Sequence, residues 1–223
     1  MIKPKTRIFL VDDHPIVRRG LQLLIGLERD LTVCGAAESA PVAVAKVLET
    51  KPDLVVVDLA LKSGSGLELI KQLRSQHPKL KMLVFSMRDE GVYAERALRA
   101  GANGYITKEE GAEKALEAIR LILQGRNYVS ERISAKMVER IAGGGTLGQT
   151  ALELLSDREL EVLEMIGEGQ GSREIAEQLH VSMKTVESHR EHIKTKLGLT
   201  SASELVRDAI NWMRTKRELG GTI

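Results

Sequence analysis

Residues 54–59 read Leu-Val-Val-Val-Asp-Leu, and residues 7–13 read Arg-Ile-Phe-Leu-Val-Asp-Asp. Each stretch is a short run of mainly apolar side chains that ends in aspartate. Uninterrupted apolar runs of this length are typical of strands in a parallel sheet that helices cover on both faces. We therefore predict two such strands, each of which places carboxylates at its carboxyl end.

Strand and helix patterns alternate outward from these two stretches. Expected strands cover residues 7–11, 31–37, 54–57, 81–85 and 104–107. Expected helices cover residues 16–27, 41–48, 67–73, 93–99 and 112–123. This alternation predicts an α/β fold, a five-stranded doubly wound parallel sheet with right-handed crossovers.

The pattern changes near Gly125. We expect a first domain at residues 1–126, a linker at 127–150 with glycines at 143–145 and 148, and a second domain at 151–223. Residues 156–159 (Ser-Asp-Arg-Glu) and 201–204 (Ser-Ala-Ser-Glu) have the form of capping boxes, which begin helices. The expected helices run from 156 to about 167, over 173–179 and 183–197, and from 201 to about 216, with a further short one at 137–141. The second domain is therefore predicted to be smaller and all-α.

The composition is that of a globular protein, because 43% of the 223 residues are hydrophobic and 29% are charged. Aromatic residues make up only 3%, which argues against base stacking as a binding mode. The single cysteine, Cys34, is expected in the core; it cannot form an internal disulfide, and it favours a reducing cytoplasm. No apolar run approaches the length of a membrane span, and residues 1–6 do not resemble a signal peptide, so we expect no membrane partner.

Polar groups follow four of the five expected strands. In open α/β sheets, ligands bind outside the carboxyl ends of the strands. The residues expected at this edge are Asp12, Asp13, Asp58, Ser86, Thr107 and Lys108. Three carboxylates close together require a cation, and an all-oxygen ligand set suits Mg²⁺.

These groups suit phosphoryl transfer to the protein itself. Asp58 can attack phosphorus and form an aspartyl phosphate, while Mg²⁺ and Lys108 neutralise charge and Ser86 offers a hydroxyl to a phosphoryl oxygen. An aspartate-nucleophile phosphohydrolase is an alternative, but such enzymes generally need a second aspartate two residues later, where this chain has Ala60. We therefore expect a phospho-accepting switch with at most slow self-dephosphorylation, and not an enzyme.

Residues 7–124 resemble the receiver domain of two-component response regulators, which has a flavodoxin-like fold. The resemblance lies in residues 11–15 (Val-Asp-Asp-His-Pro), 57–59 (Val-Asp-Leu), 85–86 (Phe-Ser) and 104–108 (Gly-Tyr-Ile-Thr-Lys). It implies that Asp58 accepts phosphate from a sensor histidine kinase. It also implies that Asp13, Asp58 and the Ala60 carbonyl bind Mg²⁺ directly, whereas Asp12 acts mainly through water.

The resemblance further implies that Ser86 and Tyr105 respond to the phosphate, although position alone predicts only a half-buried aromatic at Tyr105. Two stretches depart from the family pattern. Residues 59–62 read Leu-Ala-Leu-Lys where the family often has Leu-x-Met-Pro, and the missing proline predicts a more mobile loop at the serine- and glycine-rich residues 63–66. The small Ala60 side chain near the phosphate leaves the lifetime of the phosphoryl group open. Glu109 stands where many receivers have proline, so a cis peptide bond is not assumed there.

The helices at 173–179 and 183–197 are joined by only three residues, which makes them a helix-turn-helix candidate. In the second helix, Val186, Ile193 and Leu197 share one face and are expected to pack inward. An exposed helix face can enter the DNA major groove and contact bases and phosphates. The residues assigned to such contacts are Lys184, Thr185, Glu187, Ser188, Arg190, Glu191, Lys194 and Lys196.

Charge alone leaves DNA binding open. The formal net charge is +2 overall, with +4 in residues 1–126, +1 in residues 127–150 and −3 in residues 151–223. A negative domain attracts DNA weakly, and capped helices of mixed charge are ordinary surfaces. Helices that bind protein or RNA are therefore a second alternative.

Residues 155–212 resemble the LuxR-type helix-turn-helix of the NarL/FixJ family. The matching residues are 155–159 (Leu-Ser-Asp-Arg-Glu), 161–163 (Glu-Val-Leu), 175–176 (Ile-Ala), 181–182 (Val-Ser), 185–186 (Thr-Val), His189 and 196–197 (Lys-Leu). This resemblance implies a phosphorylation-dependent transcription regulator that binds double-stranded DNA as a homodimer. Leu205, Ile210 and Trp212 are candidates for the dimer surface, and Trp212 is equally a candidate for the core.

Overall fold

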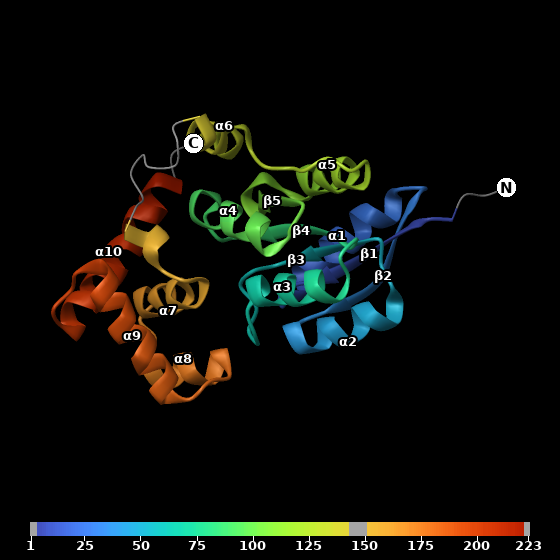
Figure 1. Cartoon of the computed structure of the whole chain (residues 1–223). Helices are drawn as coiled ribbons and strands as arrows, with labels where there is room; N and C mark the ends of the chain where they lie inside the picture. The colour runs from blue at the N-terminus through green and yellow to red at the C-terminus, as the bar shows by residue number, and fades with distance from the viewer. Residues whose placement is uncertain (1–3, 143–150, 221–223) are drawn as a thin grey trace. The chain divides into compact units, whose positions relative to one another are not determined.

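The computed structural model describes residues 4–142 and 151–220 (Figure 1). The chain forms two compact units, which divide between Glu139 and Arg140. Every described strand belongs to the first unit. Within the described residues, no helix has the length and apolar character needed to cross a membrane.

The first unit contains a parallel sheet. Its strands are β1 (Thr6–Val11), β2 (Leu31–Ala37), β3 (Leu54–Val57), β4 (Lys81–Ser86) and β5 (Gly104–Thr107). They lie in the order β2-β1-β3-β4-β5, and every neighbouring pair is parallel. This confirms the predicted five-stranded doubly wound fold. The strand order reverses between β1 and β3, and such a reversal marks the ligand crevice of an open α/β sheet.

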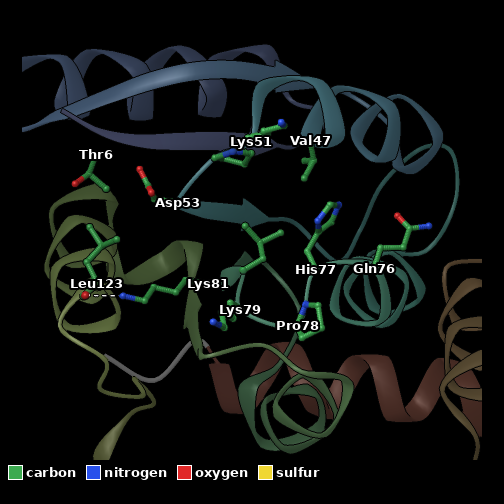
Figure 2. Close-up of a pocket in the computed structure, with 12 residues that line it drawn as sticks. Thr6, Val47, Lys51, Asp53, Gln76, His77, Pro78, Lys79, Lys81 and Leu123 are labelled. Carbon is green, nitrogen blue, oxygen red and sulfur yellow. Dashed lines mark hydrogen bonds between the residues drawn. The ribbon is translucent and has the colours of Figure 1, made fainter. Parts of the chain in front are cut away.

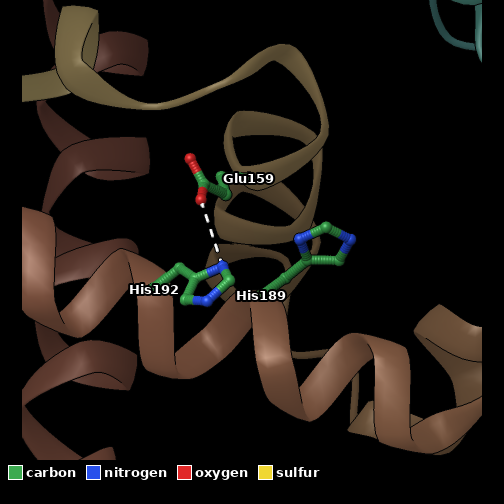
Figure 3. A group of neighbouring side chains, drawn as sticks. All are labelled: Glu159, His189 and His192. Atoms are coloured by element: carbon green, nitrogen blue, oxygen red, sulfur yellow. Dashed lines mark ion pairs between the residues drawn. The ribbon is translucent and has the colours of Figure 1, made fainter.

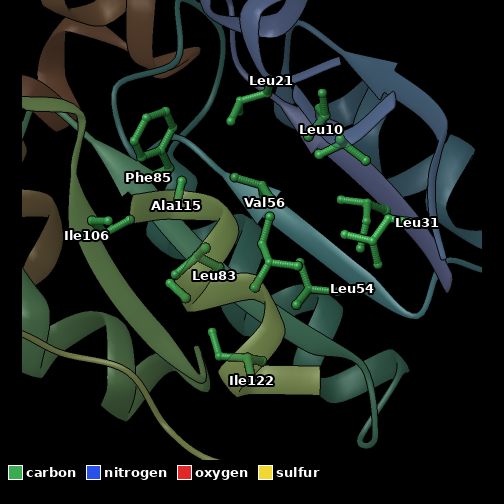
Figure 4. Close-up of a cluster of buried hydrophobic side chains, with 14 residues drawn as sticks. Leu10, Leu21, Leu31, Leu54, Val56, Leu83, Phe85, Ile106, Ala115 and Ile122 are labelled. Carbon is green, nitrogen blue, oxygen red and sulfur yellow. The ribbon is translucent and has the colours of Figure 1, made fainter. Parts of the chain in front are cut away.

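Helices cover both faces of the sheet (Figure 1). One face carries α1 (Pro15–Leu27) and α5 (Ala112–Leu123), and the other carries α2 (Ala40–Thr50), α3 (Gly66–Gln76) and α4 (Glu90–Ala100). Figure 4 shows the core beneath α1 and α5, in which Leu10 and Val56 of the sheet pack with Leu21 and Ile122 of these helices. Burying each such side chain stabilises the fold by about 1.5–3 kcal/mol.

Close approach of the backbone fixes the start of α3 next to Asp58. A Cβ added to Gly66 would lie 2.4 Å from the carbonyl oxygen of Asp58, so this position requires glycine. Ser65 caps the helix, because its hydroxyl accepts a hydrogen bond from the Glu68 amide at 3.4 Å. The loop after β3 is therefore held against the end of that strand.

A hollow of about 760 Å³ lies at the amino ends of the strands, beside Thr6, Asp53 and Lys81 (Figure 2). Lys81 Nζ donates a hydrogen bond to the carbonyl oxygen of Leu123 there, at 2.5 Å. Because Asp58 stands at the carboxyl end of β3, the hollow is at the opposite edge of the sheet from the aspartates.

The second unit is helical, as predicted. Its elements are η2 (Ala151–Leu154), α7 (Asp157–Gly167), α8 (Ser172–Leu179), α9 (Met183–Leu197) and α10 (Ala202–Gly220). Ser156 and Glu159 form the expected capping box at the start of α7. Val186 and Ile193 of α9 are buried, and Leu197 is partly buried.

The segment expected as a linker contains a helix in its described part. Helix α6 (Glu131–Ala142) begins well before residue 137, where we predicted a short helix. Ser130 caps it through the Ile133 amide at 3.2 Å, and the buried Ile133 side chain anchors it. The glycines at 143–145 and 148 lie outside the described residues. Between β5 and α5 lies a further short helix, η1 (Lys108–Glu110).

Two burial predictions were wrong. Tyr105 is fully buried, not half-buried, because its ring lies between the sheet and α4 and its hydroxyl has a backbone partner there. Cys34 is partly exposed, not part of the core, because it lies on β2 at the edge of the sheet. Its Sγ lies 3.4 Å from the carbonyl oxygen of Ile8.

Candidate functional site

Three aspartates meet at the carboxyl ends of β1 and β3. Asp12 and Asp13 directly follow β1, Asp58 directly follows β3, and all three are buried. The Asp58 amide donates to the carbonyl oxygen of Val11 at 2.8 Å, so the pairing of β1 with β3 continues into the site. The sheet itself therefore places these carboxylates side by side.

Both oxygens of Asp58 have protein partners. Its Oδ2 lies 2.5 Å from Lys108 Nζ, and its Oδ1 accepts hydrogen bonds from Ser86 Oγ at 2.6 Å and from the Ala60 amide at 3.1 Å. Lys108 Nζ also lies 2.7 Å from Oδ2 of Asp12. One ammonium thus bridges two carboxylates from neighbouring strands.

The surroundings of Lys108 keep its ammonium charged. Burial by itself lowers the pKa of Lys108, but the charges of Asp58 and Asp12 and the hydrogen bonds to them raise it by more. The net pKa of Lys108 therefore lies above its ordinary value. A permanent positive charge at this position can attract an incoming anion.

The residues around Asp13 fit a divalent cation. Oδ1 of Asp13 is buried without a hydrogen bond; His14 Nδ1 is only 2.9 Å away, but not in hydrogen-bond geometry. One ligand atom from each of Asp12, Asp13, His14 and Asp58 lies within 4.8 Å of the others. Lys108 alone does not balance three carboxylates, and the oxygen-rich set matches the preference of Mg²⁺. Sequence reasoning missed His14, although it directly follows the two aspartates.

A chain of contacts leads from Asp58 to the loop before α4. Ser86 is fully buried, and its Oγ accepts a hydrogen bond from the Arg88 amide at 3.4 Å. The hydroxyl of Tyr105 donates to the carbonyl oxygen of Arg88 at 2.7 Å. Burial raises the pKa of Tyr105 well above its ordinary value, and the nearby Tyr93 adds to the rise, so the hydroxyl stays protonated.

Thr107 is the exception at this edge of the sheet. Its amide and its hydroxyl both donate to Glu110 Oε1, at 3.1 and 3.2 Å, which caps η1. The structure therefore brings together the predicted pocket residues Asp12, Asp13, Asp58, Ala60, Ser86 and Lys108, and it gives Thr107 a local role.

In the second unit, α9 exposes most of the residues assigned to DNA. Glu187 and Ser188 are exposed, as are Lys184, Glu191 and Lys196. Thr185, Arg190 and Lys194 are partly buried. Ser182 caps the helix, because its Oγ accepts a hydrogen bond from the Thr185 amide at 3.1 Å.

Acidic partners compensate much of the positive charge on α9. Lys194 Nζ lies 2.9 Å from Glu191, and Arg190 Nε lies 3.9 Å from Glu187. Lys196 Nζ is 2.7 Å from the buried Glu159 of α7. Lys184 makes no ion pair with any described residue, which leaves its charge available to a phosphate.

The predicted dimer residues divide between core and surface. Leu205 is fully buried, Trp212 is partly buried, and Ile210 is exposed. Leu205 therefore belongs to the core of the second unit, and Ile210 belongs to its surface.

The first unit has the form of a receiver and the second that of a helix-turn-helix module. Residues 8–120 match the family model for the response regulator receiver domain, and residues 153–209 match the model for bacterial regulatory proteins of the luxR family. The oxygen regulatory protein NreC of Staphylococcus aureus is 39% identical over 209 residues, which cover 92% of this chain and 96% of NreC. The chain belongs to the response regulators that combine a receiver with a luxR-family DNA-binding domain, and it is a phosphorylation-dependent transcription regulator.

Solved structures agree with this assignment. RcsB from Salmonella enterica serovar Typhimurium, bound to promoter rprA in the presence of phosphomimetic BeF3-, is 27% identical with a TM-score of 0.66. That match covers 91% of this chain and 97% of the RcsB chain. A structure of two RcsB dimers bound to two parallel DNAs is 25% identical with a TM-score of 0.56, and covers the same shares of the two chains.

Proposed function

We propose that Asp58 accepts a phosphoryl group from a sensor histidine kinase. In this proposal Asp12, Asp13, Asp58 and the backbone carbonyl of Ala60 hold Mg²⁺. The main support for Asp58 as the acceptor is its environment. It is a buried carboxylate that contacts the Lys108 ammonium, the Ser86 hydroxyl and the Ala60 backbone amide. The buried Asp13 oxygen without a hydrogen bond supports the cation.

The proposed transfer is a single displacement at phosphorus. A carboxylate oxygen of Asp58 bonds to phosphorus while the bond from phosphorus to the donor imidazole nitrogen breaks, and the imidazole then takes a proton from solvent. Bound Mg²⁺ would neutralise charge on the phosphoryl oxygens. Lys108 stands within reach of the same oxygens and needs no proton transfer to stabilise them.

Ser86 and Tyr105 would carry the signal onward. A phosphoryl group adds roughly −2 charge and strong acceptor oxygens, to which Ser86 Oγ can turn from Asp58. Because Ser86 Oγ also accepts from the Arg88 amide, its movement would shift the loop that Tyr105 holds through the Arg88 carbonyl. The proposed result is a changed surface at α4.

The proposed output is binding of double-stranded DNA by a homodimer. The exposed face of α9 would enter the major groove, and a two-fold dimer would occupy paired half-sites. The similar RcsB structures, one bound to promoter DNA with a phosphomimetic and one with dimers on DNA, support the proposal of a DNA-bound dimer. The exposed Ile210 on α10 is the candidate for the dimer surface. A DNA partner and a single cysteine are consistent with a location in the cytoplasm.

Release of the phosphoryl group is proposed to be slow. Asp58 Oδ1 accepts from the backbone amide of Ala60, and alanine supplies no acid or base to activate water. This argues against the alternative of an aspartate-nucleophile phosphohydrolase.

Intact mass after treatment with a small phosphodonor and Mg²⁺ tests the acceptor. The wild-type chain should gain one phosphoryl group, and Asp58→Asn should gain none. Asp53→Asn is the matched control, since Asp53 adjoins the other end of the same strand and accepts from the Arg7 amide at 2.7 Å. Equal labelling of Asp58→Asn would overturn the assignment.

A further inference from the structure

A second group of potential metal ligands lies in the DNA-binding unit. Glu159 of α7 and His189 and His192 of α9 each offer one ligand atom, and these atoms lie within 4.8 Å of one another. Figure 3 shows the two imidazoles beside the carboxylate. The unit packs around these helices, since α7 and α9 are in direct contact.

The fold holds Glu159 in a fixed position. Its Oε2 accepts hydrogen bonds from the Ser156 amide and from Lys196 Nζ, both at 2.7 Å. Its Oε1 makes no hydrogen bond to a described residue and lies 3.7 Å from His192 Nδ1. One oxygen therefore anchors the side chain and the other faces the imidazoles.

The two histidines are suited to metal binding. They are three residues apart on α9, so both project from the same side of the helix. Neither imidazole makes a hydrogen bond to any residue in the described part of the chain. Their ring nitrogens are therefore available to a metal ion.

We propose that Glu159, His189 and His192 form a binding site for one divalent transition metal ion, with Zn²⁺ the best match. Two imidazoles and one carboxylate, with a fourth position left to water, are a ligand set that Zn²⁺ favours and Mg²⁺ does not. Tetrahedral Zn²⁺ requires about 3.4 Å between ligand atoms, so modest side-chain rotations would close the site.

A bound metal would join α7 to α9. It would leave Oε2 of Glu159 paired with Lys196, and it would fix His192, which is exposed beside the side chains assigned to DNA. Binding of Zn²⁺ would therefore stabilise the DNA-binding unit independently of Asp58.

Calorimetric titration of the full chain with Zn²⁺ tests the site, with excess Mg²⁺ present to occupy the aspartate cluster. The wild type should bind one equivalent that His192→Asn loses. His180→Asn is the matched control: His180 belongs to the same unit and has a φ of 53°, which asparagine tolerates. Co²⁺ gives a second readout, because a tetrahedral site with imidazole ligands produces strong visible bands that an octahedral oxygen site does not.

The expected pattern is one Zn²⁺ equivalent in the wild type, in His180→Asn and in Asp13→Asn, with a rise in the unfolding temperature that His192→Asn does not show. Equal binding by His192→Asn, or loss of the equivalent in Asp13→Asn, would overturn the proposal. His192 is exposed, so its replacement should leave the fold intact, and circular dichroism checks this.

Discussion

The ammonium of Lys108 lies 2.5 Å from Oδ2 of Asp58 and 2.7 Å from Oδ2 of Asp12. The lysine follows β5, and the two aspartates follow β3 and β1, so one side chain connects three strand ends. All three side chains are almost inaccessible to solvent. Breaking a buried ion pair by removing one partner is costly, because it leaves a buried charge uncompensated.

Replacement of Lys108 by methionine should therefore destabilise the receiver by about 3–5 kcal/mol in buffer free of divalent ions. Urea unfolding of the full chain measures this. Mg²⁺ should restore part of the loss, since a cation among the carboxylates replaces the missing charge. Lys114→Met is the control, because Lys114 pairs with Glu117 on the surface of α5 and its loss should change little. An equal effect of the two substitutions would contradict the buried bridge.

With the proposed cation site, Mg²⁺ should raise the unfolding temperature of the wild-type receiver, because it would bind the folded cluster and not the unfolded chain. At a free Mg²⁺ concentration one hundred times its dissociation constant, the free energy of unfolding should rise by about 2.7 kcal/mol. Calorimetric scans across a Mg²⁺ series measure it. Asp13→Asn should need much more Mg²⁺ for the same gain, whereas Asp53→Asn should behave as the wild type does. An unfolding temperature of the wild type that does not change with Mg²⁺ concentration would exclude the proposed cation site.

Tyr105→Phe should show a stability difference that depends on pH. Near pH 9 the loss of the hydrogen bond to Arg88 should cost about 1 kcal/mol. The pKa of Tyr105 is higher in the folded state than in the unfolded chain. The stability that Tyr105 contributes is therefore complete below pH 10.0, its ordinary pKa, and is lost as the pH rises above that value. The difference in free energy of unfolding between the wild type and Tyr105→Phe should therefore be smaller near pH 11 than near pH 9. Urea unfolding at the two pH values measures it. A difference that stays constant would mean that Tyr105 ionises normally.

The sequence predicted the strands well, because their signal is local. Apolar runs at 31–37, 54–57 and 104–107 gave the observed bounds of β2, β3 and β5. Helix ends were predicted less well, since polar residues such as Glu90 at the start of α4 do not alter the apolar period. Helix α6 was largely missed because a glycine-rich stretch follows it and because, among its residues 131–139, Ile133 alone is fully buried.

The position of the aspartates, Ser86 and Lys108 at the carboxyl ends of expected parallel strands also predicted that they share one edge of the sheet. It could not predict which carboxylates Lys108 bridges, because that depends on the rotamer of a long side chain. The proximity of His192 to Glu159 was equally out of reach, since it arises from packing of α7 against α9. Such contacts between distant segments leave no spacing pattern in one sequence.

Lys184→Ala should weaken DNA binding several-fold and reduce the slope of log affinity against log salt by about 1. The reason is that Lys184 has no acidic partner among the described residues. Lys194→Ala should have a smaller effect, because Glu191 already compensates Lys194. Fluorescence anisotropy at several salt concentrations measures both, with Lys71→Ala on α3 as the control. An unchanged slope for Lys184→Ala would place the phosphate contacts elsewhere.

The control of DNA binding by Asp58 is tested most directly by measuring affinity for operator DNA before and after phosphorylation. Genomic fragments retained by the phosphodonor-treated chain supply the operator. With Mg²⁺ and a small phosphodonor, the wild type should bind at least about tenfold more tightly, equivalent to about 1.4 kcal/mol, and Asp58→Asn should not respond. Equal affinity of the wild type with and without phosphodonor, or an equal gain in Asp58→Asn, would contradict the account.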